Sequence, residues 1–446
     1  MRDSIKIGKI KAEKVKSKVF DSAIKLCADI TMKNPNTGVL EKKECFFEFD
    51  DKYEKYLVAE RSDAFVAGLL VTALENNLDI EFENPISERL YYQLTTYFIP
   101  MISKYNSKYP LYNISLKGNK DNSIIPNKNK VATGCSGGVD SFYTMIKHGR
   151  DYEIESKRLT HIVYSSSGTD ETLEEVVIKN YKHNMSHIER IAKECNLELI
   201  SCYNNLYQFY KKPFKGFTAI YATTFGSVAY ALQKLLSTYY ISSGDPISEF
   251  NLDLSKTHGH DASVFDVFTT GCMNTENLMF YTSGSEYDRI EKENYIANNE
   301  QAQKLLVVCA YNNYAKEHEK HMNCSKCPKC LRTMAQFYSL GKLENFKESF
   351  DIEEFMNHKA KNLGKMMALN KHTYVNDMKK TAKENNVRIP IISYFYCYFW
   401  YKPIKKLRKI FKKSTLARKI YYKFNLDYKL DGYRGPNYSN YKDKIK

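Results

Sequence analysis

The chain has 446 residues, 43% of them hydrophobic, which is enough for two or three domains of roughly 150 residues each and excludes a disordered protein. Its net charge of +15 fits a general lysine surplus as well as a binding surface, so the charge alone does not indicate a nucleic-acid partner. The eleven scattered cysteines exclude a disulfide framework, and the charged N-terminus lacks the apolar core of a signal peptide; we expect a cytoplasmic, soluble protein.

Residues 1–125 are expected to form an accessory α+β module. Strands are indicated at 19–32 and 44–49, and helices at 63–77 and 87–104, with Asp63 and Ser87 as N-caps. None of these segments carries recognisable chemistry. We expect the module to cover a sheet edge or to form a dimer contact, and a polar stretch to link it to the next strand.

The most informative segment is the hexapeptide Ser-Gly-Gly-Val-Asp-Ser at residues 136–141, between a β-like run and a helix-like run. Its glycines let backbone N–H groups approach an anion, and the following helix N-terminus adds about half a positive charge. Asp140 does not suit a phosphate site unless a metal ion or a capping bond accounts for it. Together these features predict a magnesium–pyrophosphate ligand; the alternative is an ordinary serine-rich N-cap turn.

Strands and helices alternate after this loop. Strands are indicated at 159–165, 197–203 and 237–243, with helices at 180–196 and 217–236. This alternation predicts an α/β fold with a doubly wound parallel sheet, in which ligands bind beyond the carboxyl ends of the strands. Three of those ends carry polar turns, at residues 136–141, 165–169 and 242–245.

Two polar segments further along are candidates for substrate contacts. His260 and Asp261 lie in a polar loop, and Arg289 and Lys292 lie where a turn enters a helix. These side chains could contact a carboxylate or the phosphates of ATP. The alternative for each of the four is a solvated loop position.

A cysteine motif predicts a metal site. Cys324, Cys327 and Cys330 are spaced by two residues, and Cys309, at the end of an apolar run, is the best fourth ligand. Four thiolates leave no open coordination position, so the predicted zinc is structural. His318 and His321 are reserve ligands, and the alternatives are free cysteines or a redox-active pair. Cys135, just before the loop, is expected to be buried packing rather than a nucleophile.

Residues 346–446 are expected to be helical and basic. No acidic residue occurs from 389 to 426, ten lysines or arginines occur from 402 to 423, and an aromatic run occupies 394–401. A basic amphipathic helix beside aromatic residues suits an anionic membrane surface or an RNA backbone, through residues 390–424. The alternative is a helix that packs on its own protein with a solvated basic face.

The hexapeptide resembles the SGGxDS signature of the PP-loop ATP pyrophosphatases, which cleave ATP between the α- and β-phosphates and form an adenylate. Together with the later cysteine motif it is similar to the 7-cyano-7-deazaguanine (preQ0) synthase family, from residue 129 to about residue 340. The resemblance implies a PP-loop domain at 126–345, between the accessory module and the basic region. It also implies ATP and Mg²⁺ as cofactors and a structural Zn²⁺ on the four cysteines.

The implied reaction is adenylation of a carboxylate, followed by attack of ammonia or another nitrogen nucleophile to give an amide or nitrile. Asp140 and Ser141 are the candidate catalytic residues, with Asp140 organising Mg²⁺ and pyrophosphate. The nucleotide would be held by Ser136, Gly137, Gly138, Val139, Asp140 and Ser141. The family's deazaguanine-recognition residues are not found, so the substrate could be a small-molecule carboxylate or a macromolecule. The alternatives are a tRNA-modifying PP-loop enzyme and a non-catalytic nucleotide-binding subunit of a larger complex, such as a defence complex.

Overall fold

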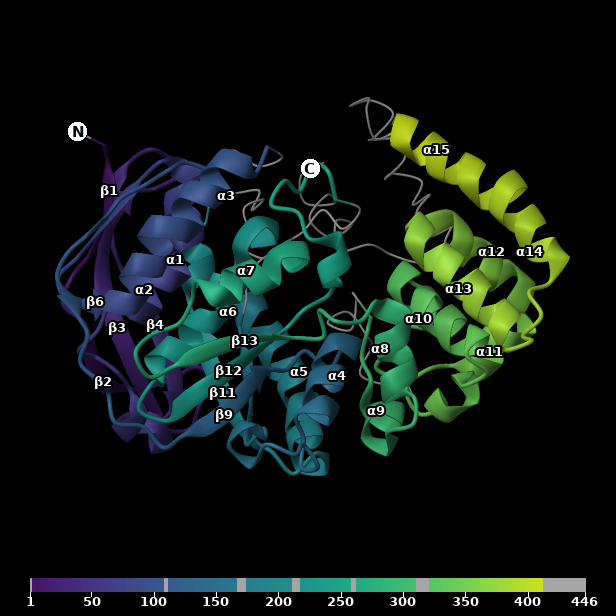
Figure 1. The fold of residues 1–446 in the computed structure, drawn as a ribbon, viewed down its shortest axis with the longest axis horizontal. Coiled ribbons are helices and arrows are strands. Elements are labelled where there is room, and N and C mark those ends of the chain that lie inside the picture. Colours follow the sequence, from purple (N-terminus) through teal and green to yellow (C-terminus); the bar gives the residue numbers. More distant parts are fainter. Residues whose placement is uncertain are drawn as a thin grey trace. The chain divides into compact units, whose positions relative to one another are not determined.

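The structure is a computed structural model that describes residues 2–107, 111–166, 174–210, 217–257, 262–309 and 321–411. The chain divides into two compact units (Figure 1). Unit 1 comprises residues 1–136 and 143–288, and unit 2 comprises residues 137–142 and 289–446. The contacts therefore divide the chain at points other than 125 and 345, the boundaries expected from the sequence.

Unit 1 is built on an 11-stranded mixed sheet. In spatial order its strands are β13 (Met279–Ser283), β12 (Leu236–Ser242), β9 (Lys130–Gly134), β10 (His161–Ser165), β11 (Glu198–Asn204), β4 (Leu40–Asp50), β3 (Ala23–Lys33), β1 (Ser4–Ile7), β5 (Asp79–Phe82) and β7 (Leu116–Lys117), with β2 (Lys11–Val15) paired to β3. Two short strands, β6 (Ile86–Ser87) and β8 (Lys120–Asp121), form a separate pair.

The five strands from β13 to β11 run parallel, as the alternating pattern predicts. Helices α4 (Val139–Lys147), α5 (Glu174–Glu194) and α6 (Phe217–Ala231) follow β9, β10 and β11 in the chain. From β9 the chain adds β10 and β11 on one side, then returns to place β12 and β13 on the other. The strand order therefore reverses at β9, and the hexapeptide follows this topological switch point, where open α/β sheets bind ligands.

The N-terminal strands continue the same sheet instead of forming a module of their own. Strand β4 pairs antiparallel with β11, with Phe49 opposite Cys202 and Phe47 opposite Asn204. Both phenylalanines are fully buried. They belong to one cluster of buried hydrophobic residues whose members are drawn from the sequence between Ile5 and Phe280. Residues of the first 125 therefore share one hydrophobic core with the parallel strands.

The predicted helices of unit 1 are present, with other bounds for α5 and α6 and a difference at one cap. Helix α1 (Asp63–Asn76) matches the expected range, and Ser87 caps α2 (Glu88–Gln93) by accepting a hydrogen bond from the Leu90 N–H at 3.1 Å. A π-helical turn (Leu94–Phe98) joins α2 to α3 (Ile99–Tyr105), and α7 spans Asp266–Gly271. Asp63 is not an N-cap: Ser62 holds that position, and the Asp63 carboxylate accepts from the Ser87 N–H at 2.8 Å instead.

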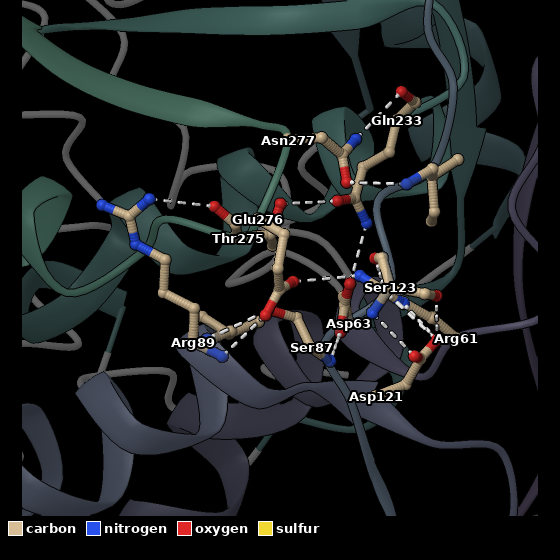
Figure 2. Close-up of polar contacts among 12 residues, drawn as sticks. Arg61, Asp63, Ser87, Arg89, Asp121, Ser123, Gln233, Thr275, Glu276 and Asn277 are labelled. Carbon is tan, nitrogen blue, oxygen red and sulfur yellow. Dashed lines mark hydrogen bonds and ion pairs between the residues drawn. The ribbon is translucent and has the colours of Figure 1, made fainter.

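A buried polar network joins the N-terminal part of unit 1 to the segment before β13 (Figure 2). The side chain of Arg61 is fully buried and pairs with Asp121 and Glu276, each at 3.1 Å. In the same network, Gln233 Nε2 donates a hydrogen bond to the Asp63 carboxylate at 2.8 Å (Figure 2). Burial raises the pKa of Asp63 to about 6, although the Ser87 N–H and Gln233 oppose the shift. The network cross-links segments that lie far apart in the sequence.

Unit 2 is helical in its described part. Its helices are α8 (Arg289–Ile296), α9 (Glu300–Leu305), α10 (Pro328–Ser339), α11 (Ile352–Asn357), α12 (Lys359–Leu369), α13 (His372–Glu384), α14 (Ile391–Phe395) and α15 (Lys402–Phe411), with a π-helical turn (Tyr396–Tyr401) between the last two. Helix α10 packs against α8, α12 and α13. Among the described helices, none has the length and apolar character needed to cross a membrane.

Candidate functional site

The hexapeptide forms a tight loop into the first turn of α4. Gly137 has a φ of +70°, a left-handed conformation that glycine adopts without strain. Its carbonyl accepts a hydrogen bond from the Val307 N–H at 2.8 Å, which ties the loop to the segment after α9. Ser136 is exposed and Ser141 is buried. Asp140 lies in the first turn of α4, where the helix dipole favours a carboxylate.

Two of the four predicted substrate contacts lie against Asp140. Arg289 Nη1 is 3.0 Å from Asp140 Oδ2, and Lys292 Nζ is 3.4 Å from Asp140 Oδ1. Arg289 begins α8 and Lys292 follows three residues later, so both project from one face of the helix. The side chain of Lys292 is fully buried and that of Arg289 is 10% exposed. The other two predicted contacts, His260 and Asp261, lie outside the described residues.

Further charged side chains surround this pair. Glu293 is fully buried and accepts from Arg289 Nε at 2.9 Å; burial raises the pKa of Glu293 to about 7, against the opposing effect of Arg289. Desolvation of its ammonium, together with Arg332 and Arg289, lowers the pKa of Lys329. Burial of the guanidinium, and to a smaller extent repulsion from Arg289, lower the pKa of Arg332. Lys329 is exposed and Arg332 is half-buried; both lie on α10, which packs against the helix that carries Arg289 and Lys292.

Two cations of α10, Lys329 and Arg332, lie on the same side of the helix because they are three residues apart. The helix begins just before them, with Cys327 as its N-cap and Pro328 as its first residue. The Arg332 guanidinium stacks 4.5 Å from the Tyr374 ring, and its Nε is buried without a hydrogen-bond partner among the described residues. A buried guanidinium N–H without a partner is costly and suits an anionic ligand.

Sequence reasoning assigned no role to Lys329 or Arg332, although both lie within the cysteine motif. Their three-residue spacing behind a helix-starting proline was the available signal. We call four cations and two carboxylic groups of the described residues the cation cluster: Arg289, Lys292, Lys329 and Arg332 with Asp140 and Glu293. Since the pKa of Glu293 is raised to about 7, the cationic excess grows as pH falls below neutrality.

Four cysteine thiols gather in unit 2. The Sγ atoms of Cys309, Cys324, Cys327 and Cys330 all lie within 4.8 Å of one another. The Cys324–Cys330 and Cys327–Cys330 sulfurs are 3.9 and 3.4 Å apart, close to the spacing of about 3.8 Å in a tetrahedral site with Zn–S bonds of about 2.3 Å. The cluster could therefore hold a metal ion such as zinc, with Cys309 as the fourth ligand, as the sequence predicts. The reserve ligand His321 contacts the Glu348 carbonyl instead, and His318 lies outside the described residues.

Asn323 holds the two halves of this cysteine cluster together. Its Oδ1 accepts from the N–H groups of Val308 at 2.8 Å and Cys309 at 3.1 Å, and its Nδ2 donates to the carbonyls of Leu306 at 2.7 Å and Ser349 at 2.9 Å. Asn323 is 3% exposed, so water does not replace these bonds. Supporting groups of this kind orient metal ligands, and no spacing rule in the sequence singles this residue out.

The loop and the cysteine cluster are connected through one short segment. Val307 bonds the Gly137 carbonyl, Val308 bonds Asn323, and the next residue, Cys309, joins the thiols. The same unit therefore contains a glycine loop, a cation cluster suited to a phosphate or carboxylate, and a thiol set suited to a closed metal site. Comparison of the chain with family models, curated proteins and solved structures found no match.

Proposed function

We propose that this protein is an ATP-dependent ligase or synthase of the PP-loop pyrophosphatase type, similar to 7-cyano-7-deazaguanine synthase. A substrate carboxylate oxygen attacks the α-phosphorus of ATP, the bond to the β-phosphate oxygen breaks, and pyrophosphate leaves. Ammonia or another nitrogen nucleophile then attacks the acyl carbon and displaces AMP, with loss of a proton from nitrogen. The products are an amide, AMP and pyrophosphate.

The observation that carries this proposal is the cation cluster beside the glycine loop. The leaving pyrophosphate gains negative charge in the transition state, and positioned donors at that point lower the barrier. Arg289 and Lys292 are held by Asp140, while the unpartnered Nε of Arg332 offers a donor that the described residues do not use. The side chain of Lys292 is buried, that of Arg289 is 10% exposed and Arg332 is half-buried, so an anionic ligand beside them would be favourable.

In this proposal Asp140 positions two cations through its two oxygens. Mg²⁺, when bound with ATP, would neutralise the phosphates and polarise the α-phosphorus. Asp140 is the candidate carboxylate for that ion, with Ser141 beside it in the first turn of α4. Loading with Mg²⁺–ATP would then release Arg289 and Lys292 toward the phosphates. The four thiols would hold zinc in a closed, structural site.

The test is to identify the products formed from ATP. The full-length protein would be incubated with ATP, Mg²⁺, ammonium and a pool of small carboxylic acids, and AMP and pyrophosphate would be quantified. We expect both products in equal amounts, and their loss in Asp140→Ala and Arg289→Gln. The matched control is Arg388→Gln, which changes an exposed arginine of the same unit.

The other readings give different results in this assay. AMP formation that requires added tRNA would favour a tRNA-modifying enzyme. ATP binding without AMP in every substrate pool, including RNA and protein, would favour a non-catalytic nucleotide-binding subunit. Formation of ADP and phosphate would contradict the proposal.

A further inference from the structure

The helical segment from α14 to α15 packs its small and polar side inward and its apolar side outward. Ser393, Cys397 and Tyr401, spaced by four residues, are buried. Helix α12 meets this side at Gly364, where an added Cβ would lie 2.6 Å from the Ser393 carbonyl oxygen. The backbones of α12 and α14 therefore approach closely at Gly364 and Ser393. The large apolar side chains of α14 are not needed for this contact.

The opposite side of the segment exposes an unusual set of large apolar side chains. Ile391 is 80% exposed, Phe399 is 72% exposed and Trp400 is 55% exposed. The full exposed face also includes Ile392, Phe395, Tyr398 and Leu407. Spacings of three, four and seven residues place most of these on one side of the helix. Single exposed apolar side chains are common on protein surfaces, but a group of them on one side of a helix marks a contact surface.

Basic residues adjoin this apolar face. Lys402 and Lys406 are exposed, and the Lys402 ammonium lies 4.0 Å from the centre of the Tyr398 ring. No acidic residue occurs between 389 and 426. The partner must therefore offer both negative charge and an apolar layer.

We propose that the face formed by Ile391, Ile392, Phe395, Tyr398, Phe399, Trp400 and Leu407 docks on an anionic lipid surface, with the helix lying in the plane of the membrane. Aromatic and aliphatic side chains would enter the boundary between headgroups and acyl chains, and lysines would meet the anionic headgroups. The two isoleucines favour lipid over RNA, because RNA is bound by stacking aromatics and polar donors. The absence of acidic residues disfavours a second copy of this face as the partner, since two such basic surfaces would repel each other. This inference does not depend on the proposed enzymatic activity.

The test uses Trp400, the only tryptophan of the chain, as a built-in reporter. The full-length protein would be titrated with vesicles of phosphatidylglycerol and phosphatidylcholine, and separately with phosphatidylcholine alone. We expect a blue shift of the emission with anionic vesicles, quenching by brominated acyl chains, and at least tenfold weaker binding to neutral vesicles. Higher salt should weaken the binding.

Variants separate this face from exposed apolar residues in general. Phe395→Ser with Phe399→Ser should lower vesicle affinity at least tenfold. The matched control is Ile247→Ser with Phe250→Ser in unit 1, two residues that are 48% and 44% exposed. This control should bind as the parent chain does, and circular dichroism of all three proteins would verify folding.

Three results would overturn the proposal. One is an emission spectrum that vesicles do not change. Another is a blue shift that depends on protein concentration without vesicles, which would assign the face to a second copy of the chain. The last is quenching by an RNA oligonucleotide in the absence of any response to vesicles, which would assign it to RNA.

Discussion

Replacement of Asn323 tests how unit 2 is held together. Its side chain makes four buried hydrogen bonds, two as acceptor and two as donor. Each is worth about 1 kcal/mol net, and the backbone groups left behind are buried, so Asn323→Ala should cost on the order of 4 kcal/mol. The same change frees the segment that carries Cys309, so zinc affinity should fall roughly 10- to 100-fold.

The assay is urea unfolding of the zinc-loaded protein, followed by Trp400 fluorescence because that residue lies in unit 2. Zinc affinity would be measured by competition with a chromophoric chelator. Asn385→Ala is the matched control, since the Asn385 side chain makes one hydrogen bond among the described residues, to the Thr381 carbonyl at 3.0 Å, from an exposed position. The reasoning fails if Asn323→Ala is no more destabilising than this control and retains zinc equally well.

Three other results are expected. Chelation of the metal should weaken pyrophosphate binding roughly tenfold, as measured by calorimetry. The reason is that the hydrogen bond from Val307 to Gly137, worth about 1 kcal/mol, then loses its support. Unchanged affinity would show that the cysteine cluster and the glycine loop are independent. Hydrogen bonds from Lys147 and Tyr143 outweigh burial and lower the pKa of Glu286 to about 2, so its stabilising contribution is complete above pH 4.5 and is lost as pH falls toward 2. Since that carboxylate is 38% exposed, the loss should be only about 1 kcal/mol, seen as a weaker acid dependence of unfolding in Glu286→Gln. Arg61→Ala should cost about 3–5 kcal/mol in thermal or urea unfolding by leaving two carboxylates without their buried partner, whereas the exposed Arg89→Ala should cost far less.

The local features of the fold could be predicted because they depend on neighbouring residues. The parallel strands, α1 and the Ser87 cap follow from periodicity and capping chemistry. The pairing of β4 with β11 could not be predicted, because it joins Phe49 to Cys202 across more than one hundred residues without a local signal. Strand β13 was also missed; what makes it a strand is its parallel pairing with β12, about forty residues earlier in the chain.

The candidate site likewise has features that the sequence predicts and features that it does not. The glycine loop and the cysteines are recognisable from spacing alone, and Arg289 and Lys292 were candidates because they enter a helix after a turn. The roles of Lys329, Arg332 and Asn323 depend on how α10 packs against α8 and on which backbone groups are buried. Those are tertiary properties, and a single sequence does not specify them.

The most direct test of the central claim is calorimetric titration of the full-length, zinc-loaded protein with Mg²⁺–ATP and with pyrophosphate. The proposal predicts binding of both ligands, at least tenfold weaker in Arg332→Gln and in Asp140→Ala, and unchanged in Arg388→Gln. It also predicts that Arg332→Gln retains zinc. If neither ligand binds, or if Arg332→Gln loses zinc while ATP binding is unaffected, then the cations serve the metal–thiolate cluster and the nucleotide site is contradicted.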